Sequence, residues 1–192
     1  MSREIFKERE RALEYEFCHK VDQKLLEKLR DDVRSEERLQ ALERATGIGD
    51  HDVLRSLDEM GISGECIVAL SLYPLVHVAW ADQRVQRRER AAILNVVEVL
   101  GHGPDSASYH LLEHWMDEPP SPELFAAWRN YVAAILDTMP STGEKLTLQE
   151  WLMGRARRVA AAAGGVLGVH AISKSEQAAL EALQNAFDDT AL

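Results

Sequence analysis

Three residues near the middle of the chain, His110, Glu113 and His114, have the spacing of a zinc site. In an H-x-x-E-H motif on a helix, the two histidines lie one turn apart on one face, with the glutamate between them. Proteins that use this motif are far longer and take another glutamate ligand from downstream. The chain contains seven histidines and 32 acidic residues, so the match can arise by chance. We therefore expect an ordinary surface helix here, and a protein that is not an enzyme.

Two clusters of arginine are the other candidates for binding a ligand. One holds four residues within seven positions: Arg84, Arg87, Arg88 and Arg90. The other holds Arg155, Arg157 and Arg158. Such clusters can bind an acidic segment or a phosphate. On a protein with a net charge of −10, they more often form weak surface pairs with neighbouring Asp and Glu. Both interpretations stay open.

The composition predicts an all-α protein, because Leu, Ala and Glu dominate and β-branched runs are few. The strong negative charge argues against binding to nucleic acid or to anionic lipid, since both require a basic surface. The two cysteines, Cys18 and Cys66, form neither a C-x-x-C pair nor a disulfide framework, which fits a reducing compartment.

The longest apolar run, residues 66–81, is shorter than the roughly 20 residues that span a bilayer. The N-terminus is charged throughout, unlike a secretory signal. We therefore predict a cytoplasmic protein without direct membrane insertion.

The chain is organised around a pair of helices that is predicted within residues 64–103. The apolar run ends at the polar corner Asp82-Gln83-Arg84, and a second apolar series with helical spacing follows, ending at Gly101. Pro74 should kink or split the first of these helices near Tyr73. Caps and breakers place the helices after residue 46 at 51–60, 64–81, 87–100, 105–117, 122–138, 142–162 and 173–187.

The sequence divides into a charged helical arm, residues 1–45, a helical domain, 46–188, and a short tail, 189–192. The arm carries 11 Lys/Arg and 12 Asp/Glu and has no Gly or Pro, which indicates one long, nearly neutral helix. Its apolar residues recur mostly every four positions, so their stripe rotates around the helix and does not fit a regular coiled coil. The arm either packs on its own domain, pairs in a homodimer or docks on a larger protein partner. The stripe consists of Phe6, Leu13, Phe17, Val21, Leu25, Leu29 and Val33.

The start of the arm also resembles the opening of subunit zeta, the small inhibitory subunit of bacterial rotary ATP synthases. The match covers about 15 residues, and the basic segment that continues that family is not found here. The resemblance implies an ATPase inhibitor that acts through its N-terminal helix. It rests on Phe6, Arg9, Glu10, Ala12, Glu14, Phe17 and His19.

The domain contains an internal repeat at an offset of 87 residues. Val85 and Glu89 fall on Ile172 and Glu176, and the apolar residues that follow Glu89 fall on those that follow Glu176. Each half is a helix, a polar corner and a helix, so two helix pairs should bury a shared core.

The first half resembles the TerB-like family, named for a tellurite-resistance protein and found also in membrane-anchored J-domain co-chaperones. The resemblance covers about residues 62–187 and implies a helical bundle with its two corners side by side. Two departures stand out. Gln83 replaces the usual glycine, and the second corner has Val169 and His170 where Asp and Gly are expected. The matching residues are Ala81, Asp82, Gln83, Val85, Glu89, Ile93, Leu94, Leu100 and Gly101.

The TerB-like resemblance also implies a divalent metal ion at the corners, where Asp82, Glu89 and Glu176 could supply three carboxylates. A hard cation prefers about six oxygens, so this set is incomplete. The alternative is that all three cap helices, where the helix dipole favours acidic residues. No other cofactor is implied.

These observations favour a non-enzymatic interaction or scaffold protein that contacts a partner through the arm and one face of the bundle. The alternatives are a metal-binding stress-response protein, as the TerB-like resemblance implies, and an ATPase inhibitor.

Overall fold

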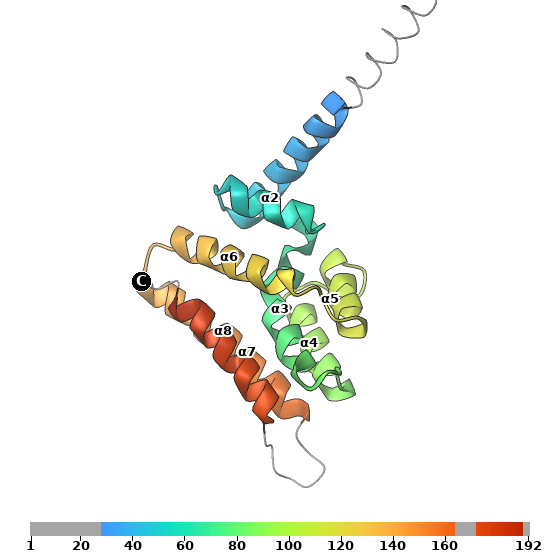
Figure 1. Cartoon of the computed structure of the whole chain (residues 1–192), viewed down its shortest axis with the longest axis vertical. Helices are drawn as coiled ribbons and strands as arrows, with labels where there is room; N and C mark the ends of the chain where they lie inside the picture. The colour runs from blue at the N-terminus through green and yellow to red at the C-terminus, as the bar shows by residue number, and fades with distance from the viewer. Residues whose placement is uncertain (1–27, 164–171, 190–192) are drawn as a thin grey trace, which may run out of the picture. The chain divides into compact units, whose positions relative to one another are not determined.

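The computed structural model describes residues 28–163 and 172–189 (Figure 1). The chain divides into two units between Gln40 and Ala41, five residues before the boundary expected from the sequence. Three predictions lie outside the described residues. They are the apolar stripe up to residue 25, the segment that resembles subunit zeta, and the second corner around residues 169–170.

All regular secondary structure in the described residues is helical, which confirms the all-α prediction. One helix covers residues 28–46. The α-helices that follow are α2 (His51–Glu59), α3 (Ile67–Ala79), α4 (Arg87–Val99), α5 (Ala107–Asp117), α6 (Glu123–Thr138), α7 (Thr142–Ala163) and α8 (Lys174–Asp188). Short 3-10 turns flank α3: η1 (Gly64–Cys66) and η2 (Trp80–Asp82).

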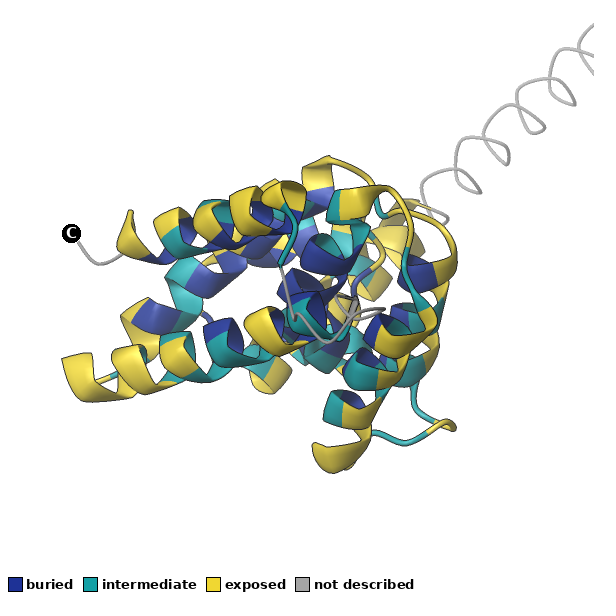
Figure 2. Ribbon diagram, turned by 90° about the horizontal axis from the view of Figure 1, so that it is seen from below, coloured by how far each residue is buried: buried dark blue, intermediate teal, exposed yellow. Residues whose placement is uncertain are grey.

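The second unit is built around α3, which is apolar on nearly every side. Nine of its 13 residues are buried, and it contacts α4, α5, α6, α7 and α8. Figure 2 shows these buried residues in the interior of the helical array. Burial of each large aliphatic side chain contributes about 1.5 to 3 kcal/mol, so this helix supplies much of the stability of the unit.

Two helix pairs enclose the core of the second unit. α4 packs against α3 and α7, while α7 packs against α3 and α8 (Figure 1). The expected shared core is therefore present, whereas the internal repeat itself stays a prediction. The largest fully buried side chains of this core include Leu70, Leu72, Leu75, Ile93, Leu112, Trp128, Leu183 and Phe187.

Local signals explain where the helices begin and end. The Asp50 side chain caps α2 by accepting the backbone N–H groups of Asp52 and Val53, at 3.0 and 3.2 Å. Gly61 and Gly101 follow α2 and α4 with φ of +76° and +87°, a backbone conformation that glycine adopts without strain. Most helix limits lie within two residues of those expected, because caps act on the adjacent turn.

α3 continues through Pro74, so the helix is not split there, because the surrounding helices hold the segment helical although one backbone donor is missing. Ser63 precedes η1 but makes no side-chain bond to its backbone. Its hydroxyl lies 3.5 Å from the Cys66 sulfur.

The described part of the first unit, residues 28–40, is helical and largely exposed. Leu29 and Val33 have 51% and 57% of their surface exposed. They belong to the apolar stripe expected along the arm.

One segment, Gly64–Asp82, is long and apolar enough to cross a membrane by length and composition alone. Half of it is buried inside the protein. It includes α3, and its environment is that of the core helix described above.

Candidate functional site

The site predicted at the first corner is built by the end of α3 and the start of α4. η2 ends at Asp82, and Gln83 follows with φ of +64° and ψ of +13°. This left-handed conformation, which the usual glycine would adopt freely, reverses the chain so that Gln86 caps α4. The turn expected from the sequence is therefore made with a non-glycine residue.

Glu89 lies in the first turn of α4 and is buried, with 2% of its surface exposed. Its Oε2 accepts the backbone N–H of Gln86 at 2.7 Å, and the two residues form a capping box. This contact satisfies a backbone donor that the helix start would otherwise leave unpaired.

Glu176 has the same position at the start of α8. Its Oε2 accepts the backbone N–H of Ser173 at 2.6 Å, and the Ser173 hydroxyl accepts the backbone N–H of Glu176 at 3.2 Å. Like Glu89, it is 2% exposed. Its second oxygen, Oε1, is buried without a hydrogen-bond partner. A lone buried carboxylate oxygen is costly, so this atom is the least satisfied part of the site.

Asp82 joins the two helix starts. Its Oδ1 accepts the Ser173 hydroxyl at 3.0 Å and also the Ser175 hydroxyl. η2 accordingly packs against α8. We call Asp82, Glu89, Ser173, Ser175 and Glu176 the carboxylate corner.

Burial controls the ionisation of Glu89. The pKa of Glu89 is raised to about 7, mainly by desolvation and also by the negative charges of Glu176 and Asp82. The N–H of Gln86 and the positive charge of Arg84 act in the opposite direction. At neutral pH, Glu89 is therefore protonated in a substantial fraction of molecules.

The carboxylate corner fits helix capping better than metal binding. Glu89 and Glu176 each accept a backbone N–H through one oxygen, and Asp82 accepts a serine hydroxyl. A hard cation prefers about six oxygens. Among the described residues, no group of three or more His, Cys, Asp or Glu side chains is arranged to hold a metal ion. The metal site at these three residues stays a prediction.

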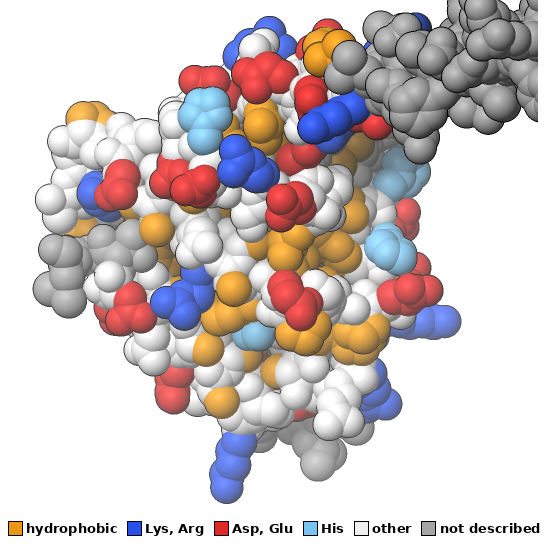
Figure 3. Space-filling view, turned by 45° about the horizontal axis from the view of Figure 1, so that its top comes forward, with side chains coloured by type: hydrophobic (Ala, Val, Ile, Leu, Met, Phe, Trp, Pro, Cys, Tyr) orange, Lys and Arg blue, Asp and Glu red, His pale blue; other side chains and the backbone are white. Residues whose placement is uncertain are grey.

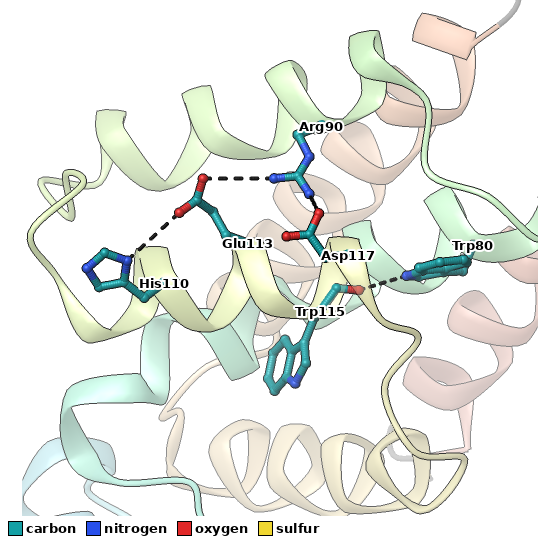
Figure 4. A network of polar contacts seen from close by, with 6 residues as sticks. All are labelled: Trp80, Arg90, His110, Glu113, Trp115 and Asp117. Carbon is teal, nitrogen blue, oxygen red and sulfur yellow. Dashed lines mark hydrogen bonds and ion pairs between the residues drawn. The ribbon is translucent and has the colours of Figure 1, made fainter.

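The residues of the H-x-x-E-H motif face other partners (Figure 4). Glu113 lies 3.8 Å from Arg90 of α4 and 3.8 Å from His110, while Arg90 also binds Asp117. His114 is exposed. Beneath this network, Trp80 Nε1 donates to the Trp115 carbonyl oxygen at 2.7 Å. These contacts hold α5 against α4 and against the end of α3.

His77 of α3 takes part in an aromatic cluster. Its ring stacks on Phe125 with centroids 4.7 Å apart, and its Nδ1 lies 3.5 Å from the Tyr73 hydroxyl. Burial lowers the pKa of His77, so the neutral form predominates at pH 7. These contacts fit a role for His77 in core packing.

A groove between α4 and α7 is the feature that sequence reasoning missed. One end is a hollow of about 350 Å³ lined by Ala92, Asn95, Val96, Val99, Arg155, Arg158 and Val159. The other is a hollow of about 510 Å³ lined by Val68, Ser71, Leu72, Leu100, Glu144, Thr147, Leu148 and Trp151. We call these two hollows the α4–α7 groove. The second arginine cluster was visible in the sequence, but its position beside Trp151 and α4 was not.

Comparisons of the chain with protein-family models, with curated proteins and with solved structures found no match. Functional inference therefore rests on the residues and contacts described above.

Proposed function

We propose that this chain is a non-enzymatic interaction or scaffold protein of the cytoplasm. One observation carries the proposal. Most of the large hydrophobic side chains that are exposed in the described residues fall on two surfaces. Leu29 and Val33 lie on the charged arm, and Val99 and Leu100 line the α4–α7 groove, whereas Leu146 lies on the opposite side of α7. Exposed apolar side chains grouped in this way mark protein interaction sites.

The TerB-like assignment of the domain belongs to this proposal. It is supported by the equivalent positions of Glu89 and Glu176 in two capping boxes, and by the contact of Asp82 with Ser173 and Ser175. These contacts between Asp82 and the start of α8 support the side-by-side placement of two corners that the resemblance implies. The corners would then hold two helix pairs in a fixed geometry and leave the outer faces for partners.

The arm is proposed to bind a protein partner, either a different protein or a second copy of this chain. It is nearly neutral, with charges of both signs around the apolar positions, and therefore offers no basic surface to nucleic acid. Figure 3 shows a similar mixture on one face of the molecule, where acidic and basic side chains alternate with hydrophobic ones.

The test compares the full chain with residues 41–192 as baits in affinity purification from the source cells. The shorter bait begins at the unit boundary and keeps the buried Leu42. We expect it to stay helical and to lose the partner, with light scattering reporting whether a dimer is lost. Equal recovery of bound proteins by the two baits, with unchanged oligomeric state, would contradict a binding role for the arm.

A metal-binding stress-response protein is the second candidate, favoured by the unpartnered Oε1 of Glu176 in a corner with Asp82 and Glu89. A divalent ion that binds the native state must raise the melting temperature. We expect a rise with Ca²⁺, Mg²⁺ or Zn²⁺ that disappears in Glu176→Gln. An unchanged melting temperature with all three ions removes this candidate.

A further inference from the structure

Both hollows of the α4–α7 groove are lined by the same face of α7. The α7 lining residues recur mostly every three or four positions from Glu144 to Arg158, which is the spacing of one helix face. These 15 residues correspond to about 20 Å of helix at 1.5 Å per residue, or about four helical turns. In the smaller hollow, Ala92 to Val99 of α4 face α7 with the same spacing. In the larger hollow, the opposite wall consists of Val68, Ser71 and Leu72 of α3 together with Leu100.

Trp151 and Arg155 separate the two hollows of the groove. The Arg155 guanidinium lies 3.5 Å from the centre of the Trp151 ring, and its Nη1 donates to the Trp151 carbonyl oxygen at 3.4 Å. This stacking fixes the guanidinium plane against an apolar wall, where a cation–π contact stabilises it. One end of the groove is therefore apolar, and the other is headed by a fixed positive charge.

Arg155 lacks a carboxylate partner in the described part of the chain. Its Nε is buried and makes no hydrogen bond. Burial and the neighbouring positive charge of Arg158 both lower the pKa of Arg155, so the second arginine adds repulsion, not neutralisation. Arg90, in contrast, is paired with Glu113 and Asp117. The chain has ten more acidic than basic residues, yet these two neighbouring arginines have no carboxylate partner among the described residues. They therefore indicate a site for a carboxylate from another molecule.

The rim of the groove is apolar and exposed. Val99 has 73% of its surface exposed and Leu100 has 42%. Val99 lines the hollow that contains Arg155, and Leu100 lines the hollow that contains Trp151. An amphipathic helix laid along such a groove would cover them with side chains at i, i+3, i+4 and i+7.

We propose that the α4–α7 groove binds an amphipathic helical segment of a partner protein, whose apolar side chains cover Val99 and Leu100 and whose carboxylates pair with Arg155 and Arg158. This inference rests on the proposed scaffold function and names the surface of the bundle that serves it. A small anion or a lipid fits less well, because sites for small molecules enclose most of the ligand surface, whereas both hollows open along the helix faces.

The experiment selects ligands for the full chain from a displayed library of random peptides about 16 residues long. We expect enriched peptides to carry apolar residues at helical spacing and Asp or Glu one or two turns away. Their binding to the full chain is then measured by fluorescence anisotropy. Arg158→Gln, at an exposed position that leaves the fold intact, should weaken binding by about 10-fold, as expected for a lost charged contact.

Matched variants separate this groove from general charge effects. Arg157→Gln removes the same charge from an exposed position of α7 that does not line the groove, and should leave affinity unchanged. Val99→Asp and Leu100→Asp, both at exposed positions that line the groove, should each weaken binding as much as Arg158→Gln. Enriched peptides without acidic residues, equal losses in Arg157→Gln and Arg158→Gln, or an absence of enriched peptides would overturn the proposal. Competition by inorganic phosphate with the same arginine dependence, and without any need for apolar residues, would also overturn it.

The groove and the scaffold function fail in different ways. If the groove variants still capture the cellular partner while residues 41–192 do not, the scaffold function stands and the groove assignment is wrong. If neither the arm nor the groove affects capture, both proposals are wrong.

Discussion

The carboxylate of Asp82 accepts a hydrogen bond from the hydroxyl of Ser173, which lies 91 residues later in the chain. Asp82 lies at the end of the first helix of one pair, and Ser173 caps the second helix of the other pair. The contact therefore couples a local capping interaction to the packing of the two pairs.

Ser173→Ala should lower the free energy of unfolding by about 1 to 2 kcal/mol, because it removes both the cap of α8 and the bond to Asp82. Ser175→Ala is the matched control. It removes a hydroxyl that binds Asp82 but does not cap the helix, and should have a smaller effect. Urea denaturation measures both variants. A double-mutant cycle with Asp82→Ala should give a coupling of at least about 0.5 kcal/mol for Asp82 and Ser173. Additive effects would contradict the link between the corners.

The raised pKa of Glu89 predicts that stability falls as pH increases. Below about pH 4.5 the carboxyl is protonated in both states. Between that pH and about 7 the unfolded chain releases its proton first, so the native state is progressively disfavoured. Above pH 7, the free energy of unfolding should therefore be lower than at pH 4.5 by on the order of 2 kcal/mol.

Glu89→Gln tests this directly, since the amide oxygen can still accept the Gln86 N–H. The variant should match the parent near pH 4.5 and be the more stable protein at pH 8, as measured by denaturation at each pH. Equal stability at both pH values would mean that Glu89 is not buried as described. Asp82, Arg84 and Glu176 also act on Glu89 and are unchanged in this comparison.

The left-handed backbone at Gln83 predicts a simple ranking of variants. Gln83→Gly relieves the strain of a side chain at φ +64° and should raise stability by about 0.5 to 1 kcal/mol. Gln83→Val should lower it by about 1 kcal/mol, since β-branched residues tolerate this conformation poorly. Thermal melting of the two variants gives the order. A Val variant as stable as the Gly variant would show that the turn has another conformation.

Gly64 allows a close approach between η1 and the preceding helix. A Cβ there would lie 3.2 Å from the Ala41 carbonyl oxygen and 3.2 Å from the Ala45 Cβ. Gly64→Val should therefore lower the melting temperature by several degrees, in keeping with an overpacking cost of about 1 to 3 kcal/mol. Gly49→Ala is the control, because a Cβ there meets no atom within 4 Å. Equal melting temperatures for the two variants would contradict the contact.

The helix limits could be predicted from the sequence because their causes are local. Asp50, Ser106 and Ser173 cap the turns that directly follow them, and Gly61 and Gly101 end helices through their own backbone conformation. These signals need no knowledge of the rest of the chain.

Contacts between distant helices were harder to anticipate. The 87-residue repeat pointed to Glu89 and Glu176, and the TerB-like resemblance pointed to Asp82, but the hydrogen bonds of Asp82 to Ser173 and Ser175 depend on how α8 packs against η2. The stacking of Arg155 on Trp151 likewise depends on α7 leaving one tryptophan face uncovered. Hydrophobicity alone would place Trp151 in the core. The α4–α7 groove could therefore be recognised only in three dimensions.

The central claim is that the exposed apolar residues of the arm and of the α4–α7 groove contact another protein chain. Site-specific photo-crosslinking in the source cells tests it most directly, with the photoreactive residue placed at Leu29, at Val99 and, as a control, at the exposed Asp137 of α6. We predict that Leu29 and Val99 crosslink to a protein, which can be a second copy of this chain, and that Asp137 does not. An absence of crosslinked protein at both Leu29 and Val99, or the same products at Asp137, would contradict the claim.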